Sequence, residues 1–77
     1  MNMLTVFVNE RSLAVPEGSV VADAVAALDP LLAERVAAGG GYVTDARGIE
    51  IAADAVVRAG AILRVVTRGR PGTDADG

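Results

Sequence analysis

One amphipathic helical segment, with β-rich segments before and after it, constrains the fold of this chain more than any other feature. Its apolar residues Val21, Ala24, Val25 and Leu28 recur at the spacing i, i+3, i+4 and i+7, which gives a helix one apolar face. A chain of 77 residues has room for one domain and buries only about 60% of the surface that its unfolded form exposes. The helix is therefore expected to pack on a single surface, within a simple core.

The ends of this helix carry recognisable signals. Ser19 is placed to cap its start, and Asp23 lies near the positive end of the helix dipole. Asp29 then offers a fresh cap and Pro30 a proline at the first helical position, so residues 31–38 are expected to form a second, short helix. The helical region is expected to bend near Pro30.

The β-rich segments predict two hairpins and a long final strand. Turn-prone residues separate the strands of each hairpin. Residues 52–59 are rich in alanine and suit a helical turn, but Val56 and Val57 could equally well pack into the core from a loop. We therefore expect this segment to be irregular. The expected strands are residues 3–8, 12–15, 42–44, 49–51 and 61–67.

This order of elements predicts an α+β domain with one main helix across one face of a mixed, four- to five-stranded sheet. A right-handed crossover through the helix would put the first and last strands side by side at the centre of the sheet. That arrangement is the β-grasp, the fold of ubiquitin. We expect it to span residues 1–67, and residues 68–77, with at most one side chain worth burying, to form a flexible tail.

Several residue types are missing, and their absence excludes most enzyme classes. The chain has no Cys, no His and no Lys, so it lacks the usual nucleophile, general base and soft metal ligands. We expect no catalytic site, no metal and no cofactor in the domain itself. Ten acidic residues against seven arginines, without a basic stripe, argue against nucleic acid as a partner. No basic leader and no run of roughly 20 apolar residues is present, so we expect a cytoplasmic protein without a membrane partner.

The sequence resembles the ubiquitin-like sulfur-carrier proteins of thiamin and molybdopterin biosynthesis over nearly all of its ordered part. Four short segments carry the resemblance: Leu4-Thr5-Val6-Phe7-Val8-Asn9-Glu10, Val15-Pro16-Glu17-Gly18-Ser19-Val20, Val21-Ala22-Asp23-Ala24-Val25-Ala26-Ala27-Leu28 and Ala59-Gly60-Ala61-Ile62-Leu63-Arg64-Val65-Val66. The resemblance implies a carrier or protein modifier whose carboxy-terminal carboxylate is adenylated by an enzyme of the ubiquitin-activating kind. That partner would consume ATP, and the activated end would then carry sulfur or be joined to another protein.

The carboxy-terminal end departs from the family pattern, which closes on Gly-Gly. Here the chain ends Asp76-Gly77, and three interpretations stay open. Gly77 acts directly as the activated carboxylate, a protease trims the tail after Gly69 or Gly72 to expose a working glycine, or the tail is inert. Paired glycines suit such a tail because residues without a side chain thread a narrow channel.

The sheet face away from the helix is the predicted docking surface. Leu4, Val6 and Val8 share one face of the first strand with Leu63 and Val65 of the last, while Met3, Thr5 and Phe7 share the other with Ile62, Arg64 and Val66. A sheet face open to solvent usually carries polar residues at alternate strand positions, so apolar residues there indicate a contact surface. Small domains, however, expose some apolar area in any case. Arg64, Arg68 and Arg70 would steer an acidic partner. A non-conjugating interaction module or a weak homodimer would use the same face. The predicted partner-binding residues are Phe7, Ile62, Arg64, Val66 and Arg68.

Overall fold

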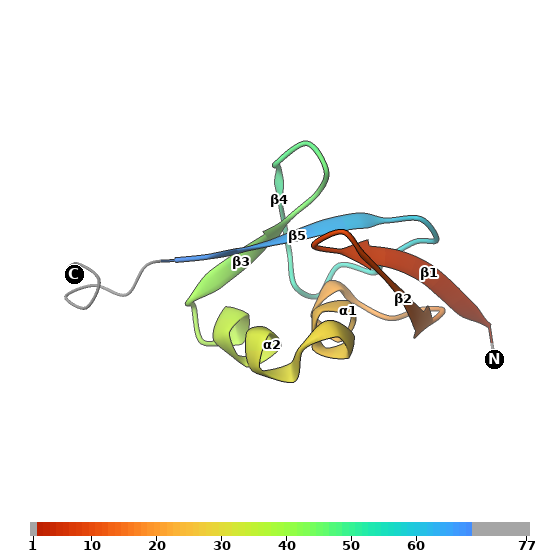
Figure 1. Ribbon diagram of the computed structural model, residues 1–77, viewed down its shortest axis with the longest axis horizontal. Coiled ribbons are helices and arrows are strands. Elements are labelled where there is room, and N and C mark those ends of the chain that lie inside the picture. The colour runs from red at the N-terminus through yellow and green to blue at the C-terminus, as the bar shows by residue number, and fades with distance from the viewer. Residues whose placement is uncertain (1, 69–77) are drawn as a thin grey trace.

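Five strands and two helices follow one another along residues 2–68, the part of the chain that the computed structural model describes (Figure 1). Their bounds are β1 Met3–Val8, β2 Arg11–Pro16, α1 Val21–Leu28, α2 Pro30–Ala37, β3 Gly41–Thr44, β4 Glu50–Ile51 and β5 Ile62–Thr67. The expected strands and the second helix are confirmed, each to within one or two residues. The segment between β4 and β5 holds turns and one isolated bridge from Val20 to Val56, as expected for an irregular loop.

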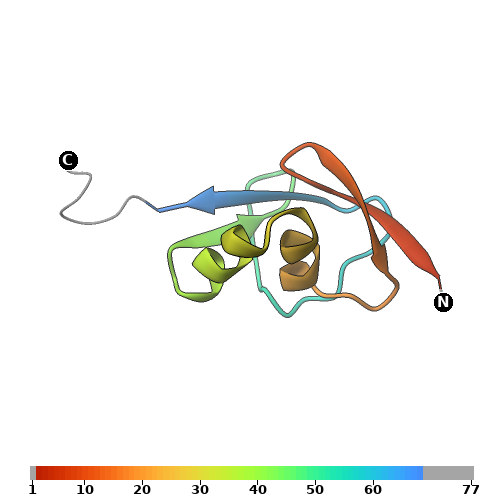
Figure 2. The ribbon, with the colours of Figure 1, turned by 60° about the horizontal axis from the view of Figure 1, so that its bottom comes forward.

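The strands form one mixed sheet in the order β2-β1-β5-β3-β4. β1 pairs antiparallel with β2 and parallel with β5, and β3 pairs antiparallel with β5 and β4. Both helices lie on the same side of the sheet (Figure 2). The α+β class and the adjacent first and last strands are thus confirmed, with β5 as the central strand.

The first hairpin turns at Asn9 and Glu10, which both have positive φ, 51° and 72°. Two such residues form the kind of two-residue turn that matches the twist of paired strands. The Asn9 side chain has a second role, because its Oδ1 accepts a hydrogen bond of 2.9 Å from the Val65 amide of β5. The turn is thereby tied to the central strand.

The two helices begin at different kinds of cap. Asp29 caps α2 as predicted, since its Oδ1 accepts from the Leu31 amide at 3.0 Å ahead of a proline at the first turn. The prediction of Ser19 as the cap of α1 is wrong, because the N-cap residue is Val20. Ser19 lies one position before the cap, where its hydroxyl donates to the Pro16 carbonyl at 2.6 Å and belongs to the preceding turn.

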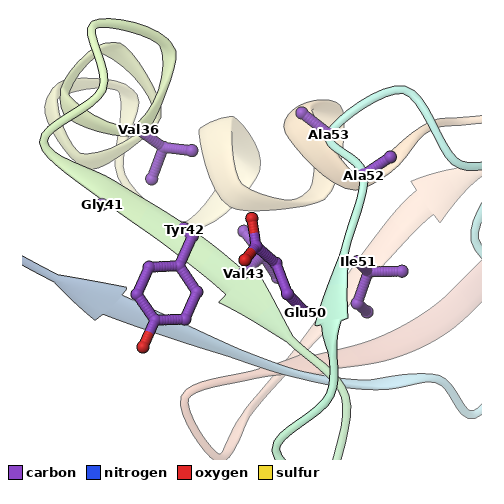
Figure 3. Close-up of a pocket in the computed structure, with 8 residues that line it drawn as sticks. All are labelled: Val36, Gly41, Tyr42, Val43, Glu50, Ile51, Ala52 and Ala53. Atoms are coloured by element: carbon purple, nitrogen blue, oxygen red, sulfur yellow. The ribbon is translucent and has the colours of Figure 1, made fainter.

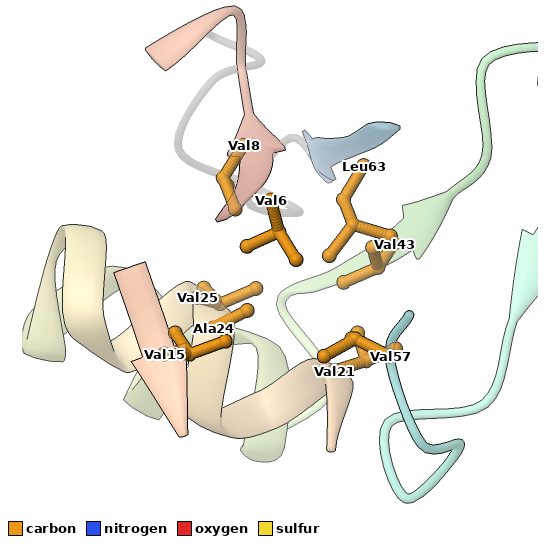
Figure 4. Close-up of a cluster of buried hydrophobic side chains, with 9 residues drawn as sticks. All are labelled: Val6, Val8, Val15, Val21, Ala24, Val25, Val43, Val57 and Leu63. Carbon is orange, nitrogen blue, oxygen red and sulfur yellow. The ribbon is translucent and has the colours of Figure 1, made fainter. Parts of the chain in front are cut away.

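The core lies between α1 and the sheet (Figure 4). α1 contributes the side chains at three of the four stripe positions, and Leu28 packs at the edge of the core. α2 has the same length but buries no residue, so α1 is the main helix by packing and not by size. Val57 plugs the core from the loop before β5, whereas Val56 points outward. The buried apolar residues are Val6, Val8, Val15, Val21, Ala24, Val25, Val43, Val57 and Leu63.

Within residues 2–68, neither helix is long and apolar enough to cross a membrane.

Candidate functional site

The sheet face away from the helices carries a row of exposed apolar side chains, which we call the open-face patch: Met3, Phe7, Ile62 and Val66. Phe7 and Ile62 are direct neighbours in the parallel pairing of β1 and β5. The exposed fractions of Phe7, Ile62 and Val66 are 36%, 47% and 38%, although alternate residues of both strands are buried under α1. Four large apolar residues exposed on one face of two neighbouring strands are of the kind that marks a contact surface.

Arg64 lies within this patch, between Ile62 and Val66 on the same face of β5. Its cross-strand neighbour on β3 is Thr44, whose side chain is small and buried. The one ion pair among residues 2–68 joins Arg47 to Asp45, in the turn after β3. The Arg64 guanidinium therefore presents its charge to solvent at the centre of the patch.

Tyr42 extends the patch toward the end of β5, opposite Val66 in the pairing of β3 with β5. The Arg68 guanidinium stacks over the Tyr42 ring at 5.1 Å from the ring centroid, a cation–π contact that orients the arginine at the surface. Tyr42 was not among the predicted site residues. The alternation of residues 42–44 was a usable signal, but only the pairing of β3 with β5 brings Tyr42 to the patch.

A hollow of about 180 Å³ opens where β3 and β4 diverge (Figure 3). Tyr42 and Glu50 line it together with the α2 residue Val36 and the segment 51–53. Glu50 is its one titratable carboxylate, and no His or Cys exists in the chain to act with it. The Glu50 carboxylate lets the hollow accept a basic or polar group of a partner.

The turn between β3 and β4 is held by Asp45 rather than by apolar contacts. Its Oδ1 accepts from the Arg47 amide at 2.8 Å and from the Ile49 amide at 3.1 Å, and its Oδ2 accepts from the Arg47 guanidinium at 3.1 Å. These donors, the Ile49 amide foremost, hold the pKa of Asp45 below its ordinary value. The role of this carboxylate is structural.

The fold brings four of the five predicted docking residues onto the open face, and Arg68 follows directly at the end of β5. Gly69, Gly72 and Gly77, the predicted carboxylate positions, lie outside the described residues, as does Arg70. In the part of the chain that the structure covers, no three Asp or Glu side chains gather where they could hold a metal ion.

Comparison of the chain with protein-family models, with curated proteins and with solved structures found no match.

Proposed function

We propose that the chain is a β-grasp carrier or modifier of the ubiquitin-like kind, whose carboxylate is activated by an adenylating enzyme that docks on the open-face patch. The strand order β2-β1-β5-β3-β4, with the parallel β1 and β5 at the centre, supports the β-grasp assignment.

The observation that carries this proposal is where the chain leaves the sheet. β5 is paired with β3 up to the contact between Gly41 and Thr67, and the Arg68 amide donates to the Gly40 carbonyl at 2.8 Å. The chain is therefore anchored through Arg68, the first residue of the predicted tail, close to Val66 and Tyr42. A partner bound to the patch would have the start of the tail at a defined point on its own surface.

Adenylation requires only one group from this chain, a carboxylate. One carboxylate oxygen bonds to the α-phosphorus of ATP and pyrophosphate leaves, and the acyl adenylate then passes its acyl group to a sulfur or nitrogen nucleophile as AMP departs. Gly77 would supply the carboxylate directly, or Gly69 or Gly72 would supply it after a protease removes the residues that follow. The partner enzyme would provide the groups that bind ATP.

Intact mass spectrometry of the protein from its own cell tests the proposal. We expect a thiocarboxylate, a trimmed tail or an adduct on another protein in the wild type and in Leu31→Asp. Leu31 is 74% exposed on α2, so this variant controls for adding a charge at an exposed apolar site. Ile62→Asp should lose the modification. An unmodified chain of 77 residues in every condition, with function unchanged when the chain is cut after Arg68, would overturn the proposal.

The second candidate is an interaction module that uses the same patch and needs no tail. Asp74 and Asp76 favour it, because negative charges close to a carboxylate at Gly77 disfavour an incoming anionic phosphate. A module cut after Arg68 keeps both binding and function, whereas a carrier keeps binding and loses function.

A further inference from the structure

A second pocket, of about 290 Å³, lies on the helix-covered side of the sheet, away from the open-face patch. Its floor is the core itself, since Val21 of α1, Leu63 of β5 and Val57 of the preceding loop line it (Figure 4). Val56, which is 63% exposed, stands at its mouth. The pocket thus joins the apolar interior to solvent.

One charged residue lines this otherwise apolar pocket. Arg58 is exposed, and the other lining residues are Val, Ile, Leu or Ala. No carboxylate lines the pocket with it, and the ion pair found within residues 2–68 involves a different arginine, Arg47. An apolar hollow with a single cation at its edge complements a molecule with one apolar end and one anionic end.

Part of the backbone around the pocket is already paired, which disfavours an extended peptide there. The Val21 amide donates to the Ala55 carbonyl, and the Val57 amide donates to the Ser19 carbonyl, both at 2.9 Å. These bonds tie the loop to the start of α1, so the amides of Val21 and Val57 are not free to pair with a peptide. The apolar side chains and the charge of Arg58 remain as the recognising features.

We propose that this pocket binds a medium-chain carboxylate, with the acyl chain against Val21 and Leu63 and the carboxylate at Arg58. At roughly 30 Å³ for each water-sized group, the volume holds about ten non-hydrogen atoms, the number in octanoate. This inference is independent of the proposed function, because it uses neither the tail nor the open-face patch.

Titration of the full-length, nitrogen-15-labelled protein with octanoate, followed by NMR, tests the proposal. We expect saturable shifts of the amides at residues 55–58 and 61–63. Arg58→Gln should weaken octanoate binding about two- to fivefold, the range for an exposed ion pair, and leave the binding of octan-1-ol unchanged. Arg11→Gln removes the same charge from β2, away from the pocket, and should change neither affinity. Val56→Asp, at an exposed position, should weaken octanoate binding and spare octan-1-ol.

Three results would overturn the proposal. Absence of saturable shifts at the pocket amides would remove the site, and shifts centred on Phe7 and Ile62 would move binding to the open-face patch. Equal affinity for octanoate and octan-1-ol in all variants would mean that the pocket binds any apolar group, including a partner's side chain. That result would refute the carboxylate assignment.

Discussion

Neighbouring residues of β5 offer a sharp test of which sheet face is core and which is surface. Leu63 is 3% exposed and belongs to the core, whereas Ile62 is 47% exposed and faces away from the helices. We predict that Leu63→Ala destabilises the domain by about 2–5 kcal/mol, the range for removing a buried leucine side chain with incomplete collapse of the cavity.

Ile62→Ala should cost much less. Full burial of an isoleucine side chain contributes about 1.5–3 kcal/mol, and Ile62 gains only roughly half of that because it is half exposed. The lower strand propensity of alanine adds a few tenths of a kcal/mol to the loss of stability. We expect about 1 kcal/mol. A domain of this size has a total stability of about 4–12 kcal/mol, so Leu63→Ala alone removes a large share of it.

Thermal unfolding followed by far-ultraviolet circular dichroism measures both variants. At about 4–8 °C per kcal/mol for a domain of this length, Leu63→Ala should lower Tm by at least about 8 °C, and Ile62→Ala by clearly less. Equal losses, or a larger loss for Ile62→Ala, would refute the assignment, because a slip of one residue in strand register exchanges the two faces.

Three further predictions concern single contacts. Asp29→Ala should cost about 1 kcal/mol by removing the cap of α2, measured as a lower urea midpoint than that of an Asp54→Ala control. Gly41→Ala should destabilise by about 1–3 kcal/mol, because its Cβ would lie 2.7 Å from the Val66 carbonyl oxygen, a backbone atom that cannot turn aside; an unchanged midpoint would contradict this. Because the pKa of Asp45 is lowered in the folded state, its contribution to stability is present above the unfolded value of about 3.9 and is lost as pH falls through the folded pKa, so Asp45→Asn should flatten the fall of the urea midpoint in acid.

Much of the fold could be predicted because its signals are local. The 3.6-residue stripe located α1, the Asp29-Pro30 pair located α2, and the alternation in residues 3–8 and 62–67 assigned their faces correctly. Ser19 was misassigned because two local uses of one hydroxyl, in the turn and in the helix cap, cannot be ranked from sequence.

The rest of the candidate site depends on contacts between distant segments. Tyr42 joins the patch only because β3 pairs with β5, and Arg68 stacks on it from 26 positions further along the chain. The apolar pocket likewise needs the loop before β5 to bridge back to Ser19. No local pattern encodes these pairings, so the composition of the patch and the pocket had to come from the structure.

The central position of β5 has a consequence for how the domain is made. The neighbour of β1 in the sheet lies more than 50 positions later in sequence, since Phe7 pairs with Ile62. The amino-terminal hairpin therefore emerges from the ribosome with one strand edge unpaired and its core face uncovered. Closure of so long a loop is slow, and exposed edges invite wrong pairing. Stable folding should therefore be held back until residues 62–67 have left the exit tunnel, so that the last strand synthesised completes the domain.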